Sequence, residues 1–229
     1  MKPRLTAPDS EAVLLKPRGA PGLVPFYAPG ASAPVQPEVA EAAIEEAAYV
    51  ALDIETTGNS PFLVIEIGAE RFNLAGSLSL FDTLVHARAP INSFARRRHL
   101  IDRRMLEGAP EFSDARRAFL HFATGAALVE HSHDAFDSYL IGRGLRRKLA
   151  NPVLDTSTLA RRVLDLPAGQ TPGLARLVEE LGVHAAPMHA ALGDAQATAA
   201  VFRTLARRAM ERFGWRTVGE MAAALIRPD

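Results

Sequence analysis

The chain is organised around one stretch, Tyr49-Val50-Ala51-Leu52-Asp53-Ile54-Glu55-Thr56-Thr57-Gly58. Its apolar residues predict a buried strand, in which side chains two positions apart point to the same side. Asp53 and Glu55 therefore project together at the strand end, whereas Leu52 and Ile54 point the other way into a core. Gly58 predicts a sharp exit from the strand, where backbone amides can come close to a ligand.

The two acids at this strand end predict a cation site. Neighbouring carboxylates repel each other, and a divalent cation held between them removes that cost. Carboxylate oxygens are the ligands that suit Mg²⁺ or Mn²⁺. The alternative is a surface strand end with two solvated acids, which so short a motif does not exclude by itself.

The overall composition is that of an ordinary globular protein, with 229 residues, 48% apolar and 23% charged. There is no apolar run long enough for a membrane span and no secretion signal after the N-terminus, so a cytoplasmic location is expected. The lack of cysteine excludes disulfides and thiolate metal sites. The formal net charge of zero is not that of an obvious duplex-binding protein, and the arginine clusters are interpreted as solvated helix faces.

The distribution of proline divides the chain. Eight of the 16 prolines fall before residue 38, which predicts a Pro-rich N-terminal extension over residues 1–46. A main domain is predicted over residues 47–213, and a short C-terminal tail over residues 214–229. Two apolar patches in the extension could pack on the domain or on a partner.

The main domain is predicted to have an α/β fold with a mixed five-stranded sheet and helices on both faces. Three strand-like runs joined by short turns indicate an antiparallel meander, and the later strands alternate with helices, which favours parallel pairing. The strands are predicted at 49–54, 62–72, 78–85, 126–130 and 152–155. Helices are predicted from residue 113, around residues 136–141, and at 156–165, 172–181 and 191–212, and a short helix is predicted over residues 38–48 after Pro37. The connection over residues 86–112 is predicted to be irregular and basic.

A second group of polar residues follows the predicted strand at 126–130. Asp137 falls in the first turn of the next helix, where the partial positive charge of the helix N-terminus favours an anion. The alternative is that Asp134 or Asp137 simply caps this helix.

A third group contains His189 and Asp194, which are five positions apart. On one continuous helix this is about 500° of rotation, so the two side chains would not share a face. Both can reach one site only if His189 lies in the loop ahead of the helix and Asp194 lies in its early turns. A loop imidazole beside acidic metal ligands suits a base near neutral pH, and the alternative is a surface loop histidine. The remaining histidines are given no role: His86, His99, His121, His131, His133 and His184.

Taken in order, the acidic pair in the form Asp-x-Glu-Thr-Thr-Gly, then Asp137, then His-x4-Asp, resemble the histidine subclass of the DEDD-type 3′–5′ exonucleases. This family includes the proofreading subunit of the bacterial replicative DNA polymerase. The resemblance covers about residues 49–208 and implies a ribonuclease H-like fold. One departure is Ser132, which stands where many members have asparagine. Another is that only a short segment follows Phe213, where the polymerase subunit has a long polymerase-binding extension, so association with a polymerase is the weaker expectation.

The resemblance also implies the roles of individual residues. Asp53, Glu55, Asp137 and Asp194 would hold two divalent metal ions, Mg²⁺ or Mn²⁺, and His189 would be the general base. The substrate contacts would be the backbone at Thr56 and Thr57 and an apolar surface at Leu63 and Val64.

The function implied is 3′–5′ exonuclease hydrolysis that releases nucleoside 5′-monophosphates, with single-stranded DNA as the expected substrate. One alternative is an exonuclease that acts on RNA or on short oligonucleotides, or a hydrolase of small phosphate esters. Another is an inactive nucleic-acid-binding module, which would not need four acids and a histidine together. The sequence does not indicate an oligomeric state or a role for the extension.

Overall fold

The computed structural model describes residues 13–26, 36–132, 135–146, 149–167, 170, 172–185 and 189–226. Its centre is a five-stranded sheet with the order β5-β4-β3-β6-β7. The strands are β3 (Tyr49–Thr56), β4 (Val64–Phe72), β5 (Ser77–Leu84), β6 (Ala127–Glu130) and β7 (Val153–Asp155). β3, β4 and β5 pair antiparallel, whereas β6 pairs parallel with both β3 and β7. The predicted meander followed by parallel strands is therefore confirmed.

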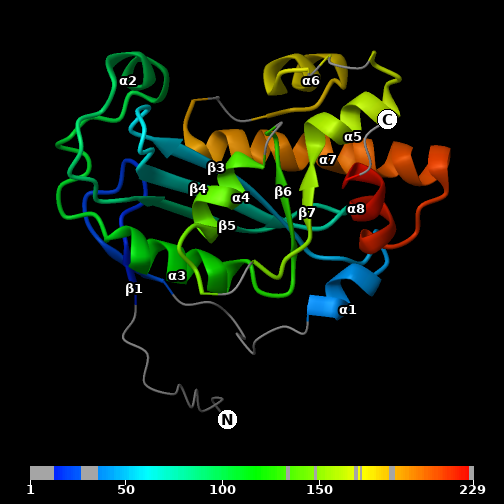
Figure 1. Ribbon diagram of the computed structural model, residues 1–229, viewed down its shortest axis with the longest axis horizontal. Coiled ribbons are helices and arrows are strands. Elements are labelled where there is room, and N and C mark those ends of the chain that lie inside the picture. Colours follow the sequence, from blue (N-terminus) through cyan, green and yellow to red (C-terminus); the bar gives the residue numbers. More distant parts are fainter. Residues whose placement is uncertain are drawn as a thin grey trace, which may run out of the picture.

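Helices cover both faces of this sheet (Figure 1). The long helix α7 (Ala191–Phe213) packs across β3 and β4 on one face, and α5 (Thr156–Val163) and α6 (Leu174–Glu180) lie against α7. On the other face, α3 (Phe112–Phe122) and α4 (Phe136–Gly142) close a second core. The predicted helices on both faces are thus confirmed.

The alternation along β3 determines what each face receives. Tyr49 and Ala51 pack in the core beneath α7, whereas Leu52 and Ile54 pack in the core beneath α3. Asp53 and Glu55 occupy the next alternate positions along the strand after Tyr49 and Ala51. These acids therefore emerge on the face where α7 lies.

Gly68 lets the start of α7 lie directly on the sheet. It pairs with Asp53 across β3 and β4. A Cβ atom at Gly68 would lie 2.0 Å from the backbone nitrogen of Leu192 and 2.2 Å from the carbonyl carbon of Ala191. Only a residue without a side chain allows this approach, and the approach brings the first turn of α7 beside Asp53.

Two helices lie where the sequence analysis predicted none. α2 (Ser93–His99) falls within the connection predicted to be irregular, and α8 (Val218–Ile226) falls within the predicted tail. Both are short, and α2 has no apolar stripe because three arginines occupy its centre. α8 packs against α1 (Gln36–Glu41) and buries Val218 and Met221.

Part of the predicted extension packs against the domain. β1 (Val13–Leu15) and β2 (Val24–Phe26) pair antiparallel, and residues 13–26 are called the N-terminal hairpin below. Leu15 is buried in the core beneath α3, and the Phe26 ring lies 5.3 Å from the ring of Phe81. Residues 1–12 and 27–35 lie outside the described residues. Within the described part of the chain, no helix has the length and apolar character needed to cross a membrane.

Candidate active site

Three carboxylates converge at the end of β3. Asp53 and Glu55 project from the strand, and Asp194 lies in the first turn of α7. Each offers an oxygen, and these oxygens all lie within 4.8 Å of one another. The structure thus brings together the acidic pair and an acid about 140 residues further along the chain.

The electrostatics of this group fit a divalent cation. Burial, followed by the charges of Asp137 and Asp194, raises the pKa of Asp53 well above its ordinary value. Burial, followed by the charge of Glu66, raises the pKa of Glu55 to about 7. Asp194 Oδ1 is buried and has no hydrogen-bond partner among the described residues. Crowded carboxylates with a free buried oxygen are costly when ionised, and a bound cation would offset that cost.

Asp137 lies beside this group in the first turn of α4. It is only 8% exposed, and burial, followed by the charges of Glu130 and Glu55, raises its pKa well above the ordinary value. After burial, its charge has the largest effect on the pKa of Asp53. Asp137 is not among the three acids whose oxygens lie within 4.8 Å. The N-cap of α4 is Ala135, so Asp137 does not occupy the cap position, and Asp134 lies outside the described residues.

Ser132 takes the place of the expected asparagine and begins the turn into α4. Its hydroxyl accepts a hydrogen bond from the Phe136 N–H at 2.8 Å, and its own N–H donates to Asp155 Oδ2 at 3.0 Å. The serine therefore satisfies a free N–H at the start of the helix that carries Asp137. Glu130, at the end of β6, accepts from the N–H of Ser138 at 2.9 Å and ties the strand to the same helix.

His189 lies in the loop directly ahead of α7, as its spacing from Asp194 predicts. It has a left-handed backbone conformation, with φ of 75°. Its N–H donates to Asp194 Oδ2 at 3.2 Å, and its side chain is exposed at the cleft described below. The imidazole and the three carboxylates thus belong to one site, and its role as a base stays a prediction.

The other histidines near the site have structural contacts. The ring nitrogens of His131 lie 2.8 Å from Thr156 Oγ1 and 3.0 Å from the Pro172 carbonyl oxygen, so both are engaged. His99 is buried at the end of α2, and its Nδ1 accepts from the Ile101 N–H. His133 lies outside the described residues.

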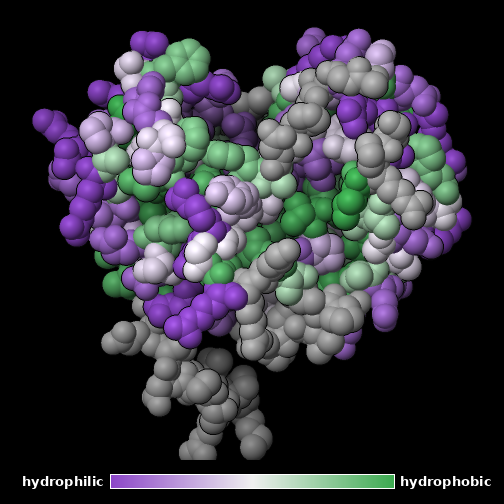
Figure 2. Space-filling model, in the orientation of Figure 1, coloured by the Kyte–Doolittle hydropathy of each residue, from purple (hydrophilic) through white to green (hydrophobic). Residues whose placement is uncertain are grey.

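The acids open into a cleft of about 400 Å³. Figure 2 shows the surface notched between the lobe that carries α2 and the lobe that carries α6. The cleft is formed by the end of β3, by α2 and by the start of α7, and its lining is Asp53, Ile54, Glu55, Thr56, Gly58, Asn92, Phe94, Ala95, Arg98, His99, His189 and Asp194. A larger hollow of about 610 Å³ at the far end of α7 contains none of these acids.

The predicted substrate-binding residues differ in their positions. Thr56 lines the cleft, whereas Thr57 is 1% exposed, and its N–H donates to the Leu63 carbonyl at 2.9 Å. The Thr57 carbonyl accepts from the Asn92 N–H, so both of its backbone groups are engaged within the protein. Val64 packs in the core beneath α3, and Leu63 packs against a small core around Ile65. Neither lines the cleft.

α2 contributes cleft residues that the sequence analysis did not identify. Phe94 is 64% exposed and lines the cleft, with the Arg97 guanidinium 5.8 Å from its ring centre. Arg98 also lines the cleft, and its positive charge acts to lower the pKa of Glu55 and of Asp194. The sequence did carry a signal for this helix, because Asn92 caps it by accepting from the Phe94 N–H at 2.7 Å.

The turn that leads from β3 toward β4 depends on Gly58, whose φ is 75°. A Cβ atom here would lie 2.5 Å from the Cβ of Ala95 in α2. The predicted sharp exit after the acids is thus confirmed, and the absence of a side chain at Gly58 lets α2 pack closely against this turn at the cleft.

Comparison with known proteins places this site in a family context. A family model described as an exonuclease matches residues 50–202. A PolC-type DNA polymerase III from Caldanaerobacter subterraneus subsp. tengcongensis is 33% identical over 186 residues, which are 79% of this chain and 13% of that protein. A DNA polymerase III subunit epsilon-like protein from Rhodobacter capsulatus is 34% identical over 179 residues, 73% of this chain and 25% of that protein. The chain therefore spans a quarter or less of the length of these relatives.

Solved structures share the fold. Exonuclease X in complex with 5′-overhanging duplex DNA is 23% identical with a TM-score of 0.59, covering 77% of this chain and 98% of that one. The nuclease domain of 3′hExo, a DEDDh family member bound to rAMP, is 18% identical with a TM-score of 0.57, covering 72% and 92%. Escherichia coli Exonuclease I in complex with a dT13 oligonucleotide is 14% identical with a TM-score of 0.60, covering 74% and 43%.

Proposed function

The chain belongs to the exonuclease family, and from this membership we propose that it is a two-metal-ion 3′–5′ exonuclease acting on single-stranded DNA. That it is a nuclease follows from the family. The direction of digestion, the substrate and the number of metal ions are the parts we propose. The observation that carries the proposal is the convergence of Asp53, Glu55 and Asp194 beside His189 in one cleft.

We propose that Asp53, Glu55, Asp137 and Asp194 hold two divalent cations, Mg²⁺ or Mn²⁺. Such cations would stabilise charge on the attacking and leaving oxygens of phosphodiester hydrolysis. The fit is supported by the raised pKa values of these carboxyl groups and by the free oxygen of Asp194.

His189 is proposed to accept a proton from the attacking water. Its side chain is exposed at the cleft, and the bond from its N–H to Asp194 fixes the loop beside the acids. The attack would break the bond between phosphorus and the 3′-oxygen of the remaining strand, and the terminal residue would leave as a nucleoside 5′-monophosphate. Thr56 lines the cleft and is the better placed of the two threonines to contact that residue. For Leu63 or Val64 to contact the terminal base, that side chain would have to leave the core in which it packs.

Single strands are proposed as the substrate because the exposed ring of Phe94 offers a stacking surface that every base can use. The similar solved structures include complexes with DNA and one with rAMP, so an RNA or short-oligonucleotide exonuclease is the second candidate. Relatives named as DNA polymerase III parts make a polymerase a proposed partner, and a cytoplasmic location is proposed from the sequence alone.

The test is digestion of 5′-labelled single-stranded DNA and RNA of matched sequence with Mg²⁺. We expect a ladder that shortens from the 3′ end, and we expect a chelator or Asp53→Ala to abolish it. Asp114→Ala is the matched control, because Asp114 is an exposed acid paired with Arg117 on α3. Internal cuts, or undiminished activity in Asp53→Ala, would overturn the proposal, and faster digestion of RNA would favour the second candidate.

His189→Ala separates the base from the metal site in the same assay. Mn²⁺ binding should survive while kcat falls about 10²–10⁴-fold, the usual contribution of a general base. Full activity in this variant would reject the role assigned to His189.

A further inference from the structure

We propose that Arg18, in the turn of the N-terminal hairpin, is a positioning residue that holds the loop carrying His189 in place. This inference rests on the proposed function, because the loop matters for catalysis only if His189 is the base. Arg18 lies outside residues 50–202, the part of the chain that the family model matches. The site of the matched domain would therefore be completed by a segment that precedes it.

The hairpin is anchored to the edge strand β5 just ahead of this turn and within it. The Lys16 N–H donates to Thr83 Oγ1 at 3.0 Å, and the Leu84 N–H donates to the Lys16 carbonyl at 2.8 Å. The Arg18 N–H donates to Asp82 Oδ2 at 2.8 Å. Because the backbone of Arg18 is fixed on β5, its side chain starts from a defined point.

The Arg18 guanidinium contacts three separate segments around the cleft. Nη1 lies 3.3 Å from Glu66 Oε2 on β4 and 3.3 Å from the His189 carbonyl oxygen. Nη2 donates to the carbonyl of His99 at the end of α2. The side chain is only 21% exposed. A planar group with several fixed donors suits such a three-way contact, whereas a lysine ammonium would not reproduce it.

Glu66 extends this contact to the start of α7. Its side chain is fully buried, and Oε2 also accepts from the Ala191 N–H at 3.1 Å. Arg18 therefore holds the carbonyl of His189, and Glu66 holds the N–H two residues later. Removal of Arg18 would leave the Glu66 carboxylate buried without its partner, which is costly.

The backbone conformation of His189 explains why the loop needs these contacts. A residue other than glycine with φ of 75° is in a sparsely populated conformation, which persists only where surrounding contacts hold it. The described contacts that do so are the Arg18 guanidinium on the His189 carbonyl and Asp194 on the His189 N–H. Loss of the first contact would let the imidazole move away from the carboxylates.

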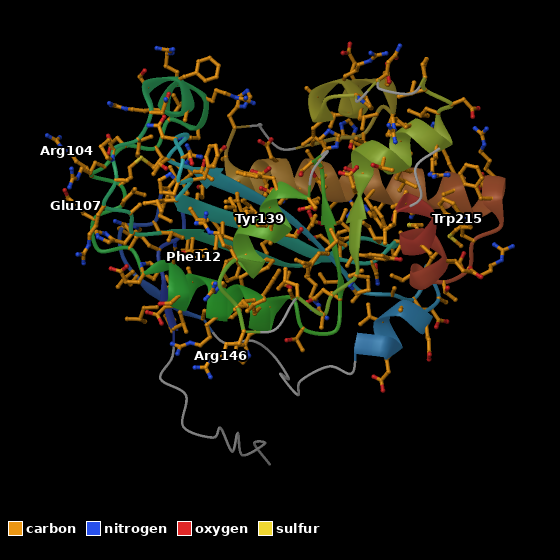
Figure 3. The ribbon with its side chains drawn as sticks, viewed as in Figure 1. Arg104, Glu107, Phe112, Tyr139, Arg146 and Trp215 are labelled. Atoms are coloured by element: carbon orange, nitrogen blue, oxygen red, sulfur yellow. The ribbon has the colours of Figure 1, made fainter. Side chains whose placement is uncertain are left out.

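The first test needs neither metal nor substrate. Amide hydrogen exchange at His189 and Ala191 should accelerate at least about 10-fold in Arg18→Ala, because local opening sets the exchange rate. Lys16→Ala is the matched control, since Lys16 lies in the same hairpin and donates through Nζ to the carbonyl of Glu107 instead. Figure 3 shows Glu107 at the outer edge of the molecule. Unchanged exchange in Arg18→Ala, or equal acceleration in Lys16→Ala, would overturn the inference.

The second test measures coupling to the base. Arg18→Ala should lower kcat about 10–100-fold, the cost of a misplaced catalytic group, while KM for the oligonucleotide changes less than about threefold. In the His189→Ala background the same change should cost less than about twofold more, because the two residues act through one contact. Arg18→Lys should fall between wild type and Arg18→Ala, and it serves as the test variant if Arg18→Ala does not fold.

The two tests distinguish failure of this inference from failure of the proposed function. Additive losses of kcat in the double variant would show that Arg18 supports only the fold, and the inference would be wrong. If the wild type lacks 3′-exonuclease activity while exchange accelerates only in the Arg18 variants, the proposed function fails and the positioning contact stands.

Discussion

Glu130 is a carboxyl group that the fold buries away from solvent at the end of β6. Burial raises its pKa to about 7, against the opposing effect of hydrogen bonds from the N–H and hydroxyl of Ser138. In the unfolded chain this group titrates near 4.5. Between these two values the folded chain binds the proton more strongly, so the free energy of unfolding falls as pH rises through this window.

We therefore expect Glu130→Gln to flatten the pH dependence of stability. Without metal, wild type should lose stability between about pH 4.5 and pH 7, with a contribution from Glu130 on the order of 1–3 kcal/mol. The variant should lose less over the same range, although Glu55 and Glu66 have raised pKa values as well and keep part of the slope. Urea unfolding across this pH range, with chelator present, measures the difference. Parallel curves for the two proteins would contradict the assignment.

The positions of some residues in the site could be predicted from the sequence, whereas the position of Arg18 could not. The positions of Asp53 and Glu55 follow from strand alternation, and those of His189 and Asp194 follow from helix periodicity, because both rules are local. The contacts of Arg18 with Glu66 and His189 join residues 48 and 171 positions apart. No local pattern encodes such a pair, and the Pro-rich sequence around Arg18 gives no sign that the folded chain buries most of its side chain.

Among the elements, the start of α7 depends on Gly68, and Gly68→Ala tests that dependence. The added Cβ would meet the backbone of Ala191 and Leu192, which cannot move aside as a side chain could. We expect a loss of about 1–3 kcal/mol in stability from overpacking and about a 10²-fold loss of activity from displacement of Asp194.

Gly76→Ala provides the control for this substitution. A Cβ atom at Gly76 would meet nothing within 4 Å, and its φ is not positive. Urea unfolding and the nuclease assay on both variants give the comparison. A Gly68→Ala protein as stable and active as Gly76→Ala would show that α7 can start elsewhere.

The strands and the long helix could be predicted from sequence because their apolar periods are long and bounded by turn residues. The two missed helices, α2 and α8, lack a clear apolar stripe, because three arginines occupy the centre of α2 and α8 is apolar at most of its positions. They are marked instead by their first residues: Asn92 caps α2, and at α8 the Thr217 N–H donates to Glu220 Oε2 while the Glu220 N–H donates to Thr217 Oγ1. This reciprocal capping box is readable in the sequence. The division of the chain into extension, domain and tail stays a prediction.

For the whole molecule, the crowded carboxylates predict that divalent cations stabilise the fold. A ligand that binds only the folded state at 100 times its Kd adds about 2.7 kcal/mol, which corresponds to a rise in Tm of roughly 5–10 °C for a chain of this size. We expect this rise with Mn²⁺ near pH 8, measured by circular dichroism against a chelator. Asp53→Asn should abolish the rise and should itself increase Tm without metal, because one repelling charge is gone. An equal rise in Asp53→Asn would place the cation elsewhere.

The N-terminal hairpin also covers a sheet edge through which copies of the protein could associate. β5 is the outermost strand on its side of the sheet, and such a strand offers unpaired N–H and C=O groups to other chains. Lys16 occupies this edge at Leu84, and the Phe26 ring covers Phe81. A protein that begins after the hairpin would keep its acids but would lose Arg18 and expose the edge of β5, so aggregation would accompany the loss of kcat expected for Arg18→Ala.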